Sequence, residues 1–220
     1  MNHDKTVKVT FIHTAQVLVK VFSDLIEKHQ LNITAQHVVH SELLERAIKQ
    51  GMTTELAEKI KETCISYSKD SELVVCTCSS LGEVAENIRL ENGKQVIRID
   101  RAMANTAVHS GENILVLAAL ESTLAPTATV LNSSQKIEKT DNNIEYHVVE
   151  NCWPFFLDGE INKYHQAIAD VIAQKQDNYD CIVLAQASMT DAISLVKDKR
   201  ALMLSSPDIG IQLLAKQLIQ

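Results

Sequence analysis

Residues 73–80 read Leu73-Val74-Val75-Cys76-Thr77-Cys78-Ser79-Ser80, a short apolar run that passes directly into thiols and hydroxyls. Two other runs, Ile114-Leu115-Val116-Leu117 and Ile182-Val183-Leu184, are also continuously apolar. Such runs are typical of parallel strands that are covered on both faces by helices. We therefore expect these three segments to form central strands.

Along the rest of the chain, short apolar or β-branched segments alternate with longer segments of helical period. This alternation predicts an α/β fold with parallel sheets and crossover helices. Strands are expected at residues 7–13, 35–40, 73–77, 95–99, 113–119, 143–150, 180–185 and 201–204. Helices are expected at residues 15–29, 41–49, 53–69, 81–90, 101–109, 122–133, 160–176, 189–197 and 207–219.

The sequence favours two pseudo-symmetric parallel-sheet lobes. In both halves of the chain, an apolar strand ends in a small polar or sulfur-containing turn, at residues 73–80 and 182–188. With three prolines, six glycines and no Gly/Ser-rich stretch, the chain has no flexible linker, so the lobes should be tightly joined. The first lobe is expected at residues 1–103 plus 205–220, and the second at 104–204.

Composition limits the partners and the location. The 220 residues include 21 Lys and Arg against 28 Asp and Glu, which gives 21 − 28 = −7, and no basic cluster suits nucleic acid. No apolar stretch reaches the roughly 18 residues of a membrane span, and the N-terminus leads straight into a strand. Five cysteines are an odd number and are expected as free thiols. We expect a soluble, cytoplasmic protein with no nucleic-acid or membrane partner.

Polar side chains follow almost every expected strand, at the edge where open parallel sheets bind ligands. Hydroxyls there, together with the free amides of helix N-termini, could bind a substrate carboxylate. Helix capping alone is the alternative for each of them. The candidate substrate-binding residues are His13, Thr14, Ser79, Ser80, Ser122, Thr123, Ser188, Ser205 and Ser206.

Cys78 is the main candidate for chemistry. A thiol between a strand end and a helix start lies in the field of the helix N-terminus, which favours the thiolate. Cys76 ranks behind it, because it should still lie within the sheet. The alternative is that both are small core residues, as free cysteines often are.

Neither a metal nor a cofactor is expected. The eight histidines do not have the spacing of metal ligands, and no glycine-rich nucleotide-binding loop is present. The sequence therefore predicts a cofactor-independent mechanism.

Five blocks of sequence resemble an uncharacterised subgroup of the aspartate/glutamate/hydantoin racemase superfamily. The run 75–82 carries a Cys-Ser-Ser turn similar to the Cys-Asn-Thr or Cys-Ser-Thr turn of that superfamily. The other four blocks are residues 98–103, 117–123, 183–189 and 204–207. In that superfamily, members that racemise acids use two thiols on opposite faces of the α-carbon. The resemblance implies the racemase fold, a small amino-acid or related carboxylic-acid substrate, Cys78 as one acid/base and a possible homodimer.

The resemblance also places Gln186 where the second cysteine belongs, and an amide cannot exchange a proton as a thiol does. Glu121 or His13 could act as the second base. The first hypothesis is a cofactor-independent amino-acid racemase or isomerase. The alternatives are a single-cysteine lyase or decarboxylase, and a non-catalytic small-acid binding protein on the same fold.

Overall fold

The structure is a computed structural model that describes residues 6–90 and 93–218. The chain divides into two compact units, residues 1–99 with 210–220 and residues 100–209. The chain crosses from the first unit to the second after Ile99 and returns within its last helix, after Ile209.

The first unit is built on a four-stranded parallel sheet of order β2-β1-β3-β4. Its strands are β1 (Val7–His13), β2 (Ile33–Val39), β3 (Leu73–Cys76) and β4 (Gln95–Arg98), and its helices are α1 (Val17–Lys28), α2 (Ser41–Gln50), α3 (Thr54–Ser68) and α4 (Ser79–Glu86). On one face Phe22 of α1 packs against Phe11 of β1. On the other face, α2, α3 and α4 cover Ile12, Val74 and Cys76.

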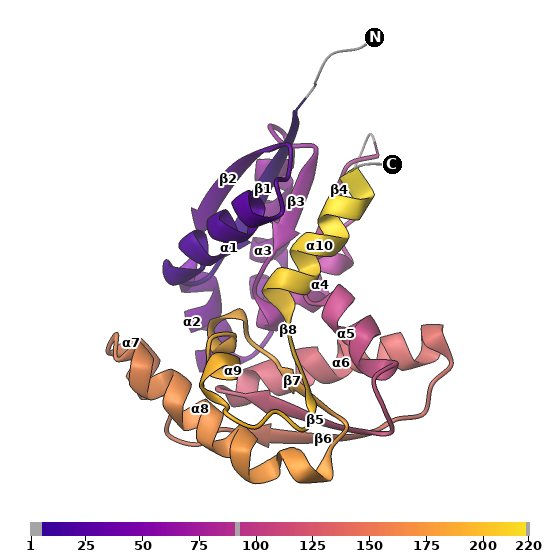
Figure 1. Cartoon of the computed structure of the whole chain (residues 1–220). Helices are drawn as coiled ribbons and strands as arrows, with labels where there is room; N and C mark the ends of the chain where they lie inside the picture. Colours follow the sequence, from indigo (N-terminus) through magenta and orange to yellow (C-terminus); the bar gives the residue numbers. More distant parts are fainter. Residues whose placement is uncertain (1–5, 91–92, 219–220) are drawn as a thin grey trace. The chain divides into compact units, whose positions relative to one another are not determined.

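The second unit repeats this topology with a parallel sheet of order β6-β5-β7-β8. Its strands are β5 (Asn113–Ala118), β6 (Asn143–Val148), β7 (Cys181–Leu184) and β8 (Leu202–Ser205). Its helices are α5 (Arg101–Val108), α6 (Glu121–Glu138), α7 (Trp153–Leu157), α8 (Ile161–Lys175), α9 (Ala192–Leu195) and the start of α10 (Ser206–Leu218), with 3-10 turns at Gln176–Asn178 and Ala187–Met189. Figure 1 shows the two units and their helices.

Both faces of the second sheet are buried. Leu115 and Leu117 lie in a core with Tyr164 of α8, whereas Ile114 and Val116 lie in a core with residues of α5 and α6. Because successive side chains of a strand point to opposite faces, a strand buried on both faces must be apolar throughout. This confirms the prediction from the continuously apolar run, and β3 and β7 are likewise flanked by strands on both sides.

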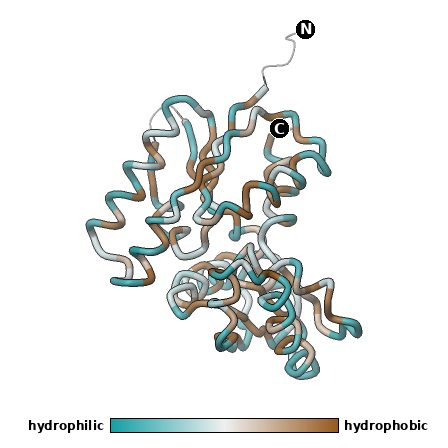
Figure 2. Tube along the Cα trace, turned by 90° about the vertical axis from the view of Figure 1, so that its left-hand side faces the viewer, coloured by the Kyte–Doolittle hydropathy of each residue, from teal (hydrophilic) through white to brown (hydrophobic). Residues whose placement is uncertain are grey.

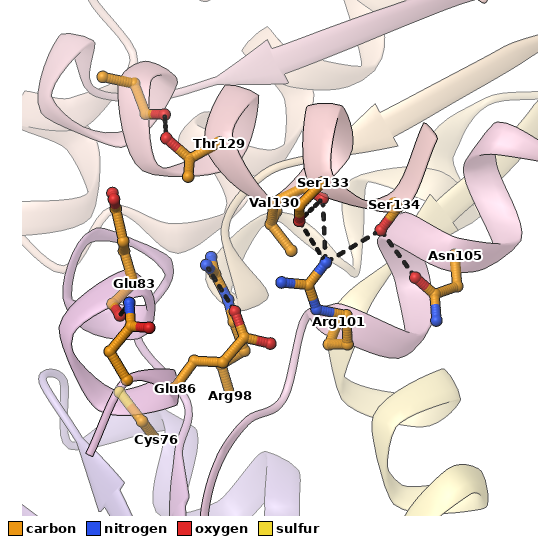
Figure 3. A network of polar contacts seen from close by, with 12 residues as sticks. Cys76, Glu83, Glu86, Arg98, Arg101, Asn105, Thr129, Val130, Ser133 and Ser134 are labelled. Atoms are coloured by element: carbon orange, nitrogen blue, oxygen red, sulfur yellow. Dashed lines mark hydrogen bonds and ion pairs between the residues drawn. The ribbon is translucent and has the colours of Figure 1, made fainter. Parts of the chain in front are cut away.

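Side-chain caps and cross-links fix the helices. Thr53 accepts a hydrogen bond from the Leu56 amide at 3.2 Å and caps α3. Arg101 of α5 donates to the hydroxyls of Ser133 and Ser134 on α6, at 2.6 and 3.1 Å (Figure 3). Along the helices of both units, hydrophilic and hydrophobic residues alternate, as one buried and one exposed side require (Figure 2).

The expected strands and helices are confirmed, with four differences, one of which is that α4 spans residues 79–86 rather than 81–90. The sequence predicts no helix at Trp153–Leu157, where five residues are too few to show a helical period. The helix expected at 189–197 is instead a 3-10 turn followed by the four-residue α9. Helix α6 extends to Glu138 rather than ending near 133. Within the described residues, no helix is both long enough and apolar enough to cross a membrane.

Candidate active site

Cys78 lies in the turn that joins β3 to α4. Its backbone is extended, with φ −97° and ψ 116°, and α4 begins at the next residue. Its carbonyl oxygen accepts a hydrogen bond from the Leu81 amide at 3.1 Å. Its side chain is 8% exposed and contacts the apolar core beneath α4. Cys78 is therefore the N-cap residue of α4, and its side chain makes no capping hydrogen bond.

Cys76 has a different environment. It is the last residue of β3 and is 2% exposed. Its thiol donates a hydrogen bond to the Cys78 carbonyl oxygen at 3.6 Å. This bond engages Cys76 with the backbone of the same turn.

The remaining three thiols are buried within the units. Burial raises the pKa of Cys64 to about 12, that of Cys152 to about 11 and that of Cys181 to about 12. Cys181 lies inside β7 and has no exposed surface. A buried thiol with such a raised pKa remains protonated near neutral pH and is a poor base.

His13 and Thr14 follow β1, on the strand next to β3. His13 is completely buried, and both of its ring nitrogens have protein partners. Its Nδ1 is 2.8 Å from the Thr77 hydroxyl and its Nε2 is 2.9 Å from Nδ1 of His37. Thr14 is 6% exposed. The geometry places His13 beside the Cys78 turn as a bonded core histidine.

On the opposite side of β3, Arg98 ends β4 and is also buried. Its Nη1 is 3.9 Å from the Glu86 carboxylate (Figure 3). A Cβ added at Gly82 of α4 would lie 2.9 Å from the guanidinium, so glycine at that position makes room for it. The Cys78 helix is thus packed against a buried cation.

Matching the two sheets by register identifies the position equivalent to Cys78. Ile12 pairs with Cys76 in the first sheet, and Leu117 pairs with Leu184 at the same rung of the second. The next bonds also correspond: the Thr77 amide donates to Ile12 O at 3.0 Å, and the Ala185 amide donates to Leu117 O at 2.9 Å. One residue further along, Cys78 of the first unit corresponds to Gln186 of the second.

Gln186 has a defined role in the second unit. Its backbone is extended, with φ −126° and ψ 138°, and it precedes the 3-10 turn Ala187–Met189. Its side-chain Oε1 accepts a hydrogen bond from the Ala119 amide at 2.6 Å. The side chain therefore joins the ends of β7 and β5, as a structural amide would.

Glu121, Ser122 and Thr123 form the first turn of α6, directly after β5. The Glu121 side chain is exposed and Thr123 is buried. The Ser122 hydroxyl oxygen is buried and has no hydrogen-bond partner among the described residues. The Ser206 hydroxyl, after β8, is in the same state, and Ser205 beside it is also buried. Buried hydroxyls without partners in the described part of the chain are suited to bind a ligand or an ordered water.

Ser188 is engaged elsewhere. Its hydroxyl is 2.9 Å from the Tyr164 hydroxyl, and its carbonyl accepts a hydrogen bond from His165 Nε2 at 2.8 Å. Burial raises the pKa of Tyr164, so this phenol is not ionised near neutral pH. Both partners of Ser188 belong to α8.

Within each unit, the candidates gather at the carboxyl ends of the parallel strands. The first unit holds His13, Thr14, Cys76, Cys78, Ser79 and Ser80, and the second holds Glu121, Ser122, Thr123, Gln186, Ser188, Ser205 and Ser206. Thr77 and His37 were not among the candidates, because the bond that links them to His13 depends on strand register. Among the described residues, no group of three or more His, Cys, Asp or Glu could hold a metal ion.

Comparison with solved structures identifies the architecture. The chain superposes on glutamate racemase from Bacillus anthracis with a TM-score of 0.71 and 12% identity, over 99% of this chain and 83% of the other. The chain has the aspartate/glutamate racemase fold. Aspartate racemase from Picrophilus torridus shares this fold, with a TM-score of 0.66 and 14% identity over 97% and 93% of the two chains.

The racemase fold also includes allantoin racemase from Pseudomonas fluorescens, with a TM-score of 0.58 and 12% identity over 96% of this chain and 90% of the other. No protein-family model and no curated protein matches the sequence. The similarity of this chain to the racemases is therefore one of structure and not of sequence.

Proposed function

We propose that the protein is a cofactor-independent racemase or isomerase that acts on a small amino acid or a related carboxylic acid, with Cys78 as an acid/base. The observation that carries this proposal is the register equivalence of Cys78 and Gln186 on the racemase fold. Cys78, our proposed acid/base, and Gln186 occupy the same place at the ends of two equivalent sheets.

The proposed chemistry begins with proton transfer at the α-carbon. The Cys78 thiolate takes the α-proton, and the electron pair of the C–H bond remains on the substrate as an enediolate. Return of a proton to the opposite face completes racemisation and requires a second donor. Gln186 has no proton of suitable pKa, and both ring nitrogens of His13 have partners in the chain. Glu121, an exposed carboxyl in the first turn of α6, is our proposed second base.

Hydroxyls and helix-start amides are proposed to bind the substrate carboxylate. Ser79 and Ser80 lie in the first turn of α4, and Ser122 and Thr123 lie in that of α6. The Ser122 and Ser206 hydroxyls support this role, because they are buried without a partner in the described chain. The unpaired amides at a helix start also favour anions, because they carry the positive end of the helix dipole.

One observation favours a second candidate function. Gln186 uses its carbonyl oxygen to bind the Ala119 amide, which is a structural role and not proton transfer. An enzyme with Cys78 as its single acid/base would protonate an enediolate from one face only, as a lyase or decarboxylase does. If Cys78 also transfers no proton, the remaining function is the binding of a small acid without a chemical reaction. From the sequence we propose a cytoplasmic location, and from the resemblance to the racemase superfamily we propose a homodimer, whose mass light scattering would measure.

The test is α-hydrogen exchange in deuterated water. We would incubate the protein with small L- and D-amino acids and substituted malonates and follow α-deuteration by NMR. We expect deuteration that falls at least a hundredfold in Cys78→Ala, because the general base is lost. Cys64→Ala, which removes another buried thiol of the same unit, should retain it. Exchange that persists in Cys78→Ala would refute the proposed role of this thiol.

A further inference from the structure

Three side chains form a continuous hydrogen-bonded line that ends at the residue before Cys78. His37 Nδ1 is 2.9 Å from His13 Nε2, and His13 Nδ1 is 2.8 Å from Thr77 Oγ1. Thr77 Oγ1 in turn donates to the Ile12 carbonyl oxygen at 3.0 Å. The three side chains come from β2, β1 and the end of β3, all within the first unit.

Donor and acceptor counting fixes the direction of this line. The single hydroxyl proton of Thr77 is used on Ile12, so Thr77 Oγ1 must accept a hydrogen bond from His13 Nδ1. Burial, with a smaller contribution from His37, lowers the pKa of His13 to about 3, and burial also lowers the pKa of His37. Both imidazoles are then neutral near pH 7. His13 Nε2 is therefore an acceptor, and His37 Nδ1 must donate to it.

Aromatic packing holds the two imidazoles in place. Phe11 stacks on His37, with ring centroids 5.2 Å apart, and Phe22 lies 5.3 Å from the His13 ring. The two imidazole planes are within 10° of each other. With both rings fixed, the position of the Thr77 hydroxyl is fixed as well.

The outer end of the line faces a groove between α1 and β2. His37 lines this groove of about 580 Å³ together with Ser23 and Glu27 of α1. With its proton on Nδ1, His37 has an acceptor at Nε2, which is 3.3 Å from the Ser23 hydroxyl. That hydroxyl donates its single proton to the Val19 carbonyl at 2.8 Å, so Nε2 receives no strong hydrogen bond from Ser23. The inner histidine is thus shielded from solvent, whereas the outer one is not.

Thr77 occupies the last rung between β3 and β1. Its amide and its hydroxyl both donate to Ile12 O, each at 3.0 Å. Beyond this rung the chain leaves the sheet at Cys78 and enters α4 at Ser79. Any loosening of Thr77 must therefore be transmitted to the backbone that carries the thiol.

We propose that His13 and His37 are positioning residues that hold the turn between β3 and α4 in the conformation that presents Cys78. His13 acts through Thr77, and His37 acts through His13 by fixing its tautomer. This role differs from substrate binding, because neither nitrogen of His13 remains for a ligand. Only the consequence for catalysis rests on the proposed function.

Hydrogen exchange followed by mass spectrometry tests the positioning role without any substrate. Thr77→Val keeps the shape of the side chain but removes both hydroxyl bonds and leaves the His13 donor buried without an acceptor. We expect amides of residues 77–82 to exchange about tenfold faster, while those of β5 in the second unit remain unchanged. Thr77→Ser retains the hydroxyl and should restore slow exchange.

Substitution of His13 gives a matched pair. Asparagine carries an N–H donor close to the position of Nδ1, whereas leucine has none, so His13→Asn should protect residues 77–82 better than His13→Leu. If Thr77→Val exchanges like the wild type in this turn, or if exchange rises equally in β5, the positioning role is refuted. The Thr77 pair decides the matter even where a His13 variant does not fold.

The α-deuteration assay then tests the link to catalysis. We expect Thr77→Val to lower kcat about tenfold and leave KM within about twofold, because the base is misplaced and the binding groups are not. Thr34→Val, at an exposed position of β2, is the control. A turn that loosens while kcat stays unchanged would refute the link between the two histidines and catalysis. An inactive wild type would instead refute the proposed function. Hydrogen exchange alone would then test whether His13 and His37 hold the turn.

Discussion

At the scale of single residues, the five cysteines differ in their burial, hydrogen bonds and position relative to helices. Cys64, Cys152 and Cys181 are buried and their pKa values are raised, and Cys76 is bonded to backbone. Cys78 is the N-cap of α4 and lies two residues after the end of β3, whereas Cys152, the N-cap of the five-residue α7, lies four residues after the end of β6. The sequence already favoured Cys78 over Cys76, because strand and helix boundaries could be estimated from hydrophobic pattern.

His13 provides a prediction on pH and stability. Its pKa is about 3 in the folded protein, against about 6.5 in an unfolded chain. Between these values the unfolded chain binds a proton that the folded protein does not, so protonation favours unfolding. The stabilising effect of neutral His13 is fully present above about pH 6.5 and is lost as the pH falls toward 3, by up to about 1.4 kcal/mol per pH unit.

Urea unfolding at pH 7.0 and pH 4.5 measures this effect. The wild type should lose on the order of 2 kcal/mol more of its free energy of unfolding between these two values than His13→Asn, which cannot titrate. Equal losses in the two proteins would show that His13 does not remain neutral in the fold. His37, whose pKa is also lowered by burial, remains in both proteins.

At the scale of elements, helix α10 shows how close packing can override local preference. An added Cβ at Gly210 would lie 2.5 Å from the Cδ1 and Cγ1 atoms of Ile99 and 2.7 Å from its carbonyl oxygen. Such distances are impossible without movement of the backbone. Glycine at this position lets the helix approach the end of β4, although alanine is the better helix former.

Gly210→Ala should therefore destabilise the protein. Helix propensity favours alanine by about 1 kcal/mol, but overpacking against fixed backbone costs about 1–3 kcal/mol. We expect a net loss of up to about 2 kcal/mol in the free energy of unfolding by urea denaturation. Gln217→Ala, at an exposed position of the same helix, should be neutral. A stabilised Gly210→Ala protein would show that the contact with Ile99 relaxes freely.

At the scale of the whole molecule, the strands and their parallel arrangement could be predicted because both faces of each sheet demand apolar side chains. The site could be predicted only in part. Residues at strand ends were identified by position, but the line from His37 to Thr77 could not be, since Phe11 and not His13 is the register partner of His37. Helix α7 was missed because its contacts with α8, and not its own five-residue pattern, hold it.

Equivalent positions at the ends of the two sheets hold different residues. Cys78 in one unit corresponds to Gln186 in the other, so the account predicts proton transfer by a thiol on one side and by Glu121 on the other. Glutamine at the Glu121 position keeps the size of the side chain and removes its acid/base function. The two sides can therefore be separated by single substitutions.

The most direct measurement is the stereochemical course in deuterated water, from one enantiomer of an active substrate and read by chiral chromatography with mass spectrometry. The account predicts that the wild type forms the deuterated opposite enantiomer and that Cys78→Ala forms none. Glu121→Gln should lower racemisation at least tenfold more than it lowers exchange, if Cys78 acts on the starting face. Undiminished racemisation by Cys78→Ala would contradict the account.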